Sequence, residues 1–447
     1  MVLGERTSTH AEQNEKKYDR QLPMNPRPAE REYSVEHAAL SDVGLCRSNN
    51  QDSFVVAHAE DAGPDQTPGH LLVVADGMGA HAAGEVASRV AAETVLSVYR
   101  AHSNGMPEDA LRDAIRQANS EIYRQGLESD ELRGMGTTVS ALVLLPEEAV
   151  VGHVGDSRIY RLRGNELQQL TFDHSLVWEI CAAENVMESE VPAFVPRNII
   201  TRSVGPTPEV QVDVEGPFSL RTGDVFLLCS DGLSGQIEDE EIGTILHCFD
   251  PSDAAEILVD LANLRGSPDN VTLIVARVNR WQAAGSPKTT STIVSHQASL
   301  AARIFRTVLV TAGLFGLGWL IRGPQLAITA SLIGGVLAGI WSFRRGRPAA
   351  PATSGDRIRQ RLGKAPYTTC DCTLNDQSSK CMARAVQEIR DVAINRLWQV
   401  DWDRFEELSK KAQTASEQSD FAGSVQVYGE LIRFFMTQFR KTLVSEE

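Results

Sequence analysis

The chain has 447 residues, and its 59 Asp and Glu outnumber its 43 Lys and Arg, which gives a formal net charge of −16. This acidity excludes a general nucleic-acid binder, because neutralising phosphates requires a basic surface. Hydrophobic residues make up 42% and charged residues 23%, so a packed core is expected and global disorder is excluded. The 7 cysteines are scattered, which argues against a disulfide framework and favours a reducing compartment.

The first 281 residues divide into a tail and a folded block. Residues 1–33 are polar and contain no apolar segment, so we expect a disordered tail and no secretory signal. From residue 34 to residue 281 the chain has no lysine, and short apolar runs alternate with segments of helical period. This mixture predicts an α+β domain. Strands are predicted at 70–75, 140–145, 149–154, 157–162, 225–229 and 271–278.

An apolar region follows a linker. Residues 282–303 are rich in Ser, Thr, Gln and Ala, which is typical of a linker. Two charge-free segments then occur within 304–343, and the second is long enough to cross about 30 Å of hydrocarbon. Arginines flank the pair on both sides, which predicts a two-helix transmembrane hairpin at the cytoplasmic (inner) membrane, with residues 34–281 and the C-terminal region in the cytoplasm. The alternative is a buried hairpin of a soluble domain.

The C-terminal part has helical periodicity. Residues 344–380 are expected to form a second linker, and 381–447 a helical region with apolar stripes. We expect these helices to bind a protein partner or to regulate the folded block. Cys370, Cys372 and Cys381 could hold zinc, but a fourth ligand is not evident, so free thiols are the default.

Aspartates carry the chemistry of the folded block. Five of them lie at predicted strand ends or tight turns, with one arginine upstream: Asp52, Asp76, Asp156, Asp231, Asp269 and Arg47. A carboxylate at a strand end beside a glycine leaves room for an ion and exposes a backbone carbonyl. Oxygen ligands select hard cations such as Mg²⁺ or Mn²⁺. Any one of these aspartates alone would more often cap a turn, so the interpretation depends on their number.

Residues 34–281 resemble the metal-dependent PPM (type 2C) protein phosphatases of bacteria. The matching strings, in the family's order, are SDVGLCRSNNQDSF, DGMGAHAAGEVAS, GMGTTVSALVL, GHVGDSRIYRL, LTFDHSLV, ITRSVG, DVFLLCSDGL and DNVTLIVAR. The resemblance implies an α/β/β/α four-layer sandwich, here followed by the transmembrane hairpin and the α-helical C-terminal region. It also implies hydrolysis of phosphoserine or phosphothreonine on proteins, and therefore antagonism of a Ser/Thr kinase.

The resemblance assigns metal ligands. It implies that Asp76 bridges two Mn²⁺ or Mg²⁺ ions, with the Gly77 carbonyl as a further ligand. Asp231 and Asp269 resemble the other carboxylates of this binuclear site, whose ions would supply a bridging hydroxide for attack on phosphorus.

Three further assignments follow from the same motifs. Asp52 matches a carboxylate that holds metal-bound water, Asp156 a ligand of a possible third ion, and Arg47 the arginine that binds the substrate phosphate. Because no phosphoenzyme is needed, Cys46 and Cys229 are expected in the core rather than in catalysis.

The sequence also departs from the family pattern. Gln51 stands where many members have Glu, Ala80 replaces a usual Gly, and Met78 stands where eukaryotic members carry a His. His81 and His174 lie nearby, and a structural hydrogen-bonding role is expected for both. Residues 178–198 correspond to a flap beside the active site. The alternatives are a catalytically weak PPM-fold membrane scaffold or signalling module, and a phosphatase of small phosphate esters.

Overall fold

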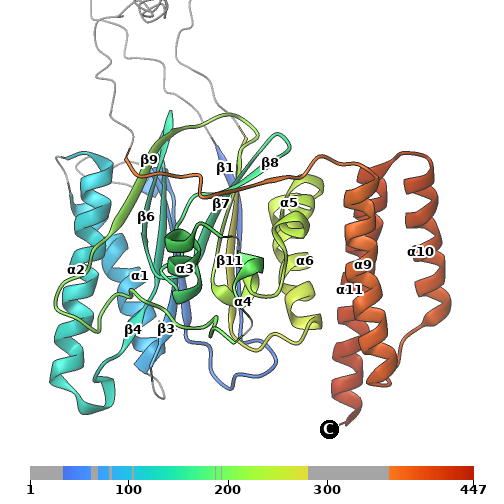
Figure 1. Ribbon diagram of the computed structural model, residues 1–447, viewed down its shortest axis with the longest axis horizontal. Helices are drawn as coiled ribbons and strands as arrows, with labels where there is room; N and C mark the ends of the chain where they lie inside the picture. Colours follow the sequence, from blue (N-terminus) through green and yellow to red (C-terminus); the bar gives the residue numbers. More distant parts are fainter. Residues whose placement is uncertain are drawn as a thin grey trace, which may run out of the picture. The chain divides into compact units, whose positions relative to one another are not determined.

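The computed structural model describes residues 34–61, 69–79, 83–102, 105–186, 188–192, 194–279 and 362–446. Within these ranges, two antiparallel sheets stack on one another (Figure 1). The first sheet runs, in spatial order, through β1 (Val35–Asp42), β11 (Val271–Val278), β10 (Val225–Cys229), β7 (Arg158–Arg163), β8 (Glu166–Gln169) and β12 (Thr368–Asp371).

The second sheet has the order β2 (Asp52–Ala57), β3 (His70–Met78), β5 (Val139–Leu144), β6 (Glu148–Val154) and β9 (Asp213–Ser219), and the short strand β4 (Gly136–Thr137) pairs with β3. Every residue of β5 is buried. A continuous apolar run of this kind is expected for a strand that is covered on both faces.

Helices cover the outer faces of both sheets (Figure 1). The second sheet packs against α1 (Ala83–Ala101) and α2 (Pro107–Glu128), and the first against α5 (Asp239–Cys248) and α6 (Pro251–Leu264). A separate apolar cluster fills the space between the sheets. Short elements complete this part: α3 (Leu176–Glu184), α4 (Asp231–Ser234) and the 3₁₀ turns Ala59–Asp61, Asp130–Leu132 and Glu188–Glu190. The predicted helix–sheet–sheet–helix sandwich is therefore confirmed.

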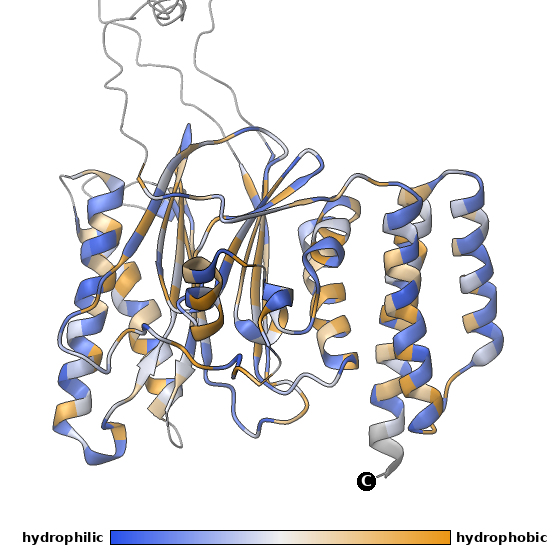
Figure 2. Ribbon diagram, in the orientation of Figure 1, coloured by the Kyte–Doolittle hydropathy of each residue, from blue (hydrophilic) through white to orange (hydrophobic). Residues whose placement is uncertain are grey.

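Local sequence signals set the start of α6. The Asp250 carboxylate accepts a hydrogen bond of 2.9 Å from the Asp253 amide, and Pro251 occupies the first helical position, where its missing N–H costs nothing. Figure 2 shows α6 as hydrophobic over most of its length. α6 can be hydrophobic on two sides because the first sheet covers one side and the C-terminal helices cover the other.

The C-terminal region packs onto the same body. It comprises β12, α9 (Asp376–Asn395), α10 (Trp402–Glu417) and α11 (Phe421–Glu446). Although 344–380 was expected to be a linker, residues 368–371 pair with β8 and extend the first sheet. The apolar sides of α9 and α11 share one core cluster with α5 and α6. The described residues therefore belong to one compact unit.

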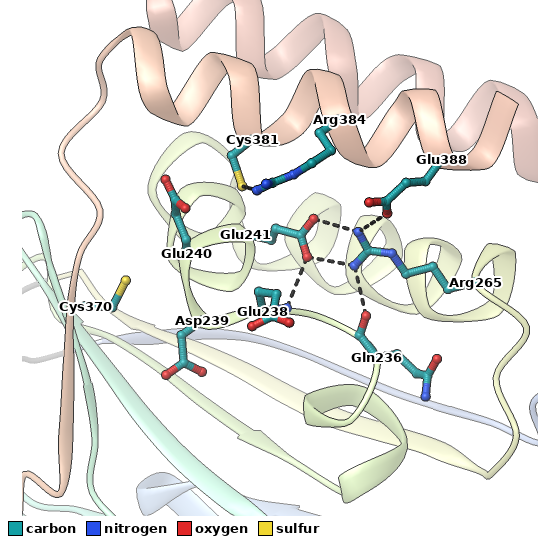
Figure 3. Close-up of a pocket in the computed structure, with 10 residues that line it drawn as sticks. All are labelled: Gln236, Glu238, Asp239, Glu240, Glu241, Arg265, Cys370, Cys381, Arg384 and Glu388. Atoms are coloured by element: carbon teal, nitrogen blue, oxygen red, sulfur yellow. Dashed lines mark hydrogen bonds and ion pairs between the residues drawn. The ribbon is translucent and has the colours of Figure 1, made fainter. Parts of the chain in front are cut away.

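Arg265, which follows α6, joins three helices (Figure 3). Its guanidinium donates two hydrogen bonds of 2.7 Å to the Glu241 carboxylate on α5 and one of 2.9 Å to Glu388 on α9. Glu241 is buried, so removing Arg265 would leave a carboxylate in a poorly hydrated place with only the Glu238 amide to donate to it.

The predicted location at the cytoplasmic membrane is corrected by the structure. Across the ranges described above, no helix combines the length and the apolarity needed to cross a bilayer. The long helix α11 illustrates the reason, because Arg433, Arg440 and Lys441 interrupt its apolar side chains, and charged residues are costly within hydrocarbon. The predicted hairpin itself, at 304–343, lies outside the described residues.

The shared core predicts cooperative unfolding. Phe435 on α11 is fully buried in the cluster that α5 and α6 also line. Phe435→Ala should reduce the free energy of unfolding by about 3–5 kcal/mol, because it leaves a cavity. Urea titrations followed by circular dichroism should show a single transition that shifts as a whole. Leu397→Ala, at a side chain that is 85% exposed, is the control and should change little. Two transitions, with only one of them shifted, would contradict the single unit.

Candidate functional site

Two of the predicted site residues face each other across neighbouring strands. Asp52 begins β2 and is the register partner of Asp76 near the end of β3. Thr138 fixes the Asp76 backbone, since its hydroxyl accepts the Asp76 amide at 2.9 Å and its own amide donates to the Asp76 carbonyl at 2.8 Å. The second sheet therefore holds these two carboxylates side by side.

Two more carboxylates reach this place, one from the first sheet and one from the turn that joins the two sheets. Asp231 begins α4, directly after β10, and Asp156 lies in the tight turn between β6 and β7. The Ser230 hydroxyl donates a hydrogen bond of 2.9 Å to Asp52, and the charge of Asp231 acts on Asp76. These contacts join the two sheets at the cluster.

Asp269 and Arg47 lie at the solvent side of the same cluster. Asp269 stands in the turn before β11, and its carboxylate accepts a hydrogen bond of 2.7 Å from the Arg47 guanidinium. Asp76 and Asp231 also interact electrostatically with Arg47. About half of the Arg47 side chain is exposed, so its other N–H groups can reach a ligand.

Asn270 was not singled out from the sequence, although it stands in the string DNVTLIVAR. It is buried, and its side-chain oxygen accepts the Gln51 amide at 2.8 Å. Its side-chain nitrogen donates to the carbonyls of Val43 and Asn49 at 2.9 and 3.0 Å. Asn270 thus fixes the loop that carries Arg47. The only signal in the sequence was an amide next to Asp269, which by itself predicts a turn.

Glycine is required at position 77. A Cβ built on Gly77 would overlap the carbonyl oxygens of Gly84 and Gln51. The absence of a side chain lets the start of α1 approach the end of β3.

Burial and mutual repulsion disfavour the ionised carboxylates. Burial, opposed by hydrogen bonds and reinforced by Asp231 and Asp269, raises the pKa of Asp52 to about 6. Burial, with Asp231 and Asp173 nearby, raises the pKa of Asp156 to about 8. The pKa of Asp76 is raised well above its usual range by burial and then by the neighbouring aspartates. In the absence of a cation the cluster is therefore electrostatically unfavourable.

The donor set fits a divalent cation. One carboxylate oxygen each of Asp52, Asp156 and Asp231 is buried without a hydrogen-bond partner. The charges of Asp52, Asp156 and Asp231 also act on Asp76, and a cation among these carboxylates would offset their repulsion. Across the described ranges, no three His, Cys, Asp or Glu side chains already close around one point. The case for a metal here therefore depends on unsatisfied oxygen donors, which hard cations prefer.

The histidine and cysteine expectations have mixed outcomes. His174 accepts the Gly155 amide at 2.9 Å and contacts Asp213 at 3.0 Å, so its contacts are structural, as expected. His81 lies outside the described residues. Cys229 is buried in the core, where burial raises its thiol pKa to about 12, but Cys46 is exposed and not a core residue.

Cys370 and Cys381 line a cavity of about 670 Å³ between α5 and α9, together with acidic residues and two arginines (Figure 3). Burial raises the pKa of both thiols. Within the described part of the chain, no three His, Cys, Asp or Glu side chains gather around one point, so free thiols remain the default for this group.

The predicted flap contains α3. Ser175 caps this helix by accepting the Trp178 amide at 3.3 Å, and Asn185 ends it in the left-handed conformation. Beyond α3, Glu188 pairs with Arg197 at 3.0 Å, and Phe194 is 85% exposed. The flap is thus a short helix followed by a polar, irregular segment.

The chain is similar to known proteins over about half of its length. Residues 47–263 match the family described as Protein phosphatase 2C. The chain is 38% identical over 254 residues to the protein phosphatase PhpP of Streptococcus pneumoniae, an alignment that covers 56% of this chain and 100% of PhpP.

Solved structures give the same result. The serine/threonine phosphatase of S. agalactiae superposes with a TM-score of 0.50 and 35% identity, covering 55% of this chain and 100% of that one. The serine/threonine phosphatase PstP/Ppp of Mycobacterium tuberculosis has a TM-score of 0.50 and 36% identity, covering 55% of this chain and 99% of that one. Each of these structures covers little more than half of this chain.

The raised carboxyl pKa values predict a pH dependence of stability. A carboxyl whose pKa is higher in the folded than in the unfolded chain makes the folded state bind more protons, so stability falls as pH rises toward the folded value. In EDTA, the free energy of unfolding should fall by about 1–2 kcal/mol between pH 6.5 and 8.5, where Asp156, with a pKa of about 8, loses its proton. Working above pH 6.5 excludes His153, whose pKa burial lowers to about 3.

The measurement is urea unfolding at the two pH values. Asp156→Asn is the matched variant, and it should reduce the fall. Stability that increases with pH across this interval would show that the carboxylates are not destabilised by one another.

Proposed function

Because the chain belongs to the protein phosphatase 2C family and is a serine/threonine protein phosphatase, we propose that it hydrolyses phosphoserine and phosphothreonine on proteins at the aspartate cluster, with two Mn²⁺ or Mg²⁺ ions. The observation that carries the proposal is the set of buried carboxylate oxygens without partners on Asp52, Asp156 and Asp231. Such oxygens are a large cost for a structural site and a requirement for a cation site.

Each residue has a distinct role in this proposal. Asp76, Asp231 and Asp269 hold the ions, together with the Gly77 carbonyl, and Asp52 orients a water molecule. When bound, such a pair of ions activates water at neutral pH and neutralises charge on the phosphate. Ser230 orients Asp52 through its hydrogen bond.

Arg47 binds the phosphate. Its planar guanidinium can present two parallel N–H groups to two phosphate oxygens. The ion pair with Asp269 keeps the guanidinium at the edge of the cluster, and Asn270 holds the loop behind it.

A third ion near Asp156 is a further part of the proposal. Asp156 is buried, has an oxygen without a partner, and feels the charge of Asp231. A cation beside Asp156 would offset the free-energy cost of burying its carboxylate. The substrates would be phosphoproteins made by a Ser/Thr kinase. The expectation of a protein partner at the C-terminal helices stays a prediction.

The catalytically weak scaffold was the main alternative. It predicts loss of the metal aspartates, and all five are present in a common cluster. Phosphatases of small phosphate esters would use the same chemistry, so they are distinguished only by substrate tests.

Metal dependence is the direct test. The full chain should hydrolyse a phosphothreonine peptide with Mn²⁺ and lose this activity in EDTA. Asp76→Asn and Asp231→Asn should each reduce kcat by about 10³-fold or more, because each removes charge that holds the ions. Asp113→Asn, at an exposed carboxylate on α2, is the matched control. Equal rates with Mn²⁺ and EDTA would refute the proposal.

The role of Arg47 can be tested separately, through its effect on KM. Arg47→Ala should raise KM for the phosphopeptide by about 10- to 100-fold, the size expected for a lost charge-assisted hydrogen bond, and Arg47→Lys should recover only part of it. Steady-state kinetics over a range of peptide concentrations provides the test, with Arg116→Ala on the exposed face of α2 as control. An unchanged KM in Arg47→Ala would exclude phosphate binding by this side chain.

A further inference from the structure

Residues 362–371 connect the C-terminal helices to three places on the phosphatase body, and we call them the strap. The strap begins with a bridge between Leu362 and Gly216 of β9, formed by backbone hydrogen bonds of 2.5 and 3.2 Å. It ends as β12 on the edge of β8. The strap itself lies outside residues 47–263, which match the phosphatase family, whereas its partners on β9 and β8 lie inside that range.

The middle of the strap is fixed by a buried carboxylate. Glu215 of β9 is 3% exposed. It accepts a hydrogen bond of 2.5 Å from the Tyr367 hydroxyl and one of 3.0 Å from the Ala365 amide. A charged group with so little access to water needs such donors, so Tyr367 has a defined position.

The Tyr367 ring packs against an aromatic residue that in turn packs against the flap. Its centroid lies 5.5 Å from that of Phe172, and the Phe172 centroid lies 5.4 Å from that of Trp178 on α3, both pairs in edge-to-face geometry. The contact is favourable for aromatic rings. Phe172 is thus placed between the strap and the first turn of α3.

Helix α3 has little else to hold it. Among its residues, all within the described part of the chain, Val177 is the only buried one. A cavity of about 590 Å³ separates α3 from the loop before α5, and Trp178, Cys181 and Tyr367 line it. The ring contacts and the Arg158 guanidinium, 5.5 Å from the Trp178 centroid, therefore carry much of the docking of α3.

We propose that Tyr367 is a positioning residue for the phosphatase: through Phe172 it docks α3, so that the C-terminal strap sets how the flap meets a phosphoprotein substrate. This inference rests on the proposed function of the cluster and of the flap beside it. A loosened flap weakens binding of a substrate that contacts it and leaves a small substrate unaffected.

The test uses the full chain and the variant Tyr367→Leu, which keeps apolar volume and removes the ring. Hydrogen exchange measured by mass spectrometry should show faster exchange across residues 176–184. With Mn²⁺, kcat/KM for a phosphothreonine peptide should fall by about 3- to 30-fold, mostly through KM, a size typical of coupling mutations. The rate with p-nitrophenyl phosphate should change by less than about twofold.

Two variants separate positioning from general stability. Tyr367→Phe keeps the ring but loses the Glu215 hydrogen bond that positions it, so its exchange and kinetics should lie between those of Tyr367→Leu and those of the unaltered chain. Phe439→Ala removes a ring that packs against Trp398, with centroids 4.7 Å apart, far along the chain from the strap. It should lower stability without changing exchange in α3. Phe172→Leu should reproduce Tyr367→Leu, and the double variant should add little to either.

Three results would overturn the inference. One is unchanged exchange in α3 in Tyr367→Leu. Another is an equal loss of rate with the peptide and with p-nitrophenyl phosphate. The third is faster exchange without any change in peptide kinetics, which would make Tyr367 a structural residue only. Failure of the proposed function would be seen separately, as equal activity of the unaltered chain with Mn²⁺ and with EDTA.

Discussion

The repulsion among aspartate side chains gathered where the two sheets meet is the constraint on which this structure depends. Asp52 and Asp76 are paired across β2 and β3. Ser230, which follows β10 of the other sheet, donates a hydrogen bond to Asp52, and the charge of Asp231 acts on both carboxylates. No stable protein would bury these charges without compensation. The free-energy cost of burying these carboxylates explains why β-strands on both sides are needed to hold the cluster. It also explains why a divalent cation is the natural occupant of the cluster.

The fold beyond the cluster supplies rigidity. The apolar layer between the sheets fixes their spacing, and α5 and α6 support the first sheet from behind. These two helices in turn pack against α9 and α11. The C-terminal region is therefore structural as well as a candidate for regulation, since it covers apolar surface and contributes an edge strand to the sheet.

Much of the fold and of the site could be predicted from the sequence, because strong local residue patterns specify the strands and the motifs that hold the aspartates. The apolar runs at β5, β6, β10 and β11 predicted strands, and the motif order predicted which aspartates would meet. The strap was missed, since TTCD has no strand pattern of its own and pairs with a strand about 200 residues earlier. Asn270 was missed for a related reason, as its partners at Val43 and Asn49 are distant in sequence.

The binding of Mn²⁺ itself tests the central claim most directly. Free Mn²⁺ can be followed by electron paramagnetic resonance as the full chain is titrated, and the account predicts that each chain removes at least two ions from solution and that Asp231→Asn removes fewer. If the signal of free Mn²⁺ grows from the first addition as it does in buffer alone, the aspartate cluster is not a cation site.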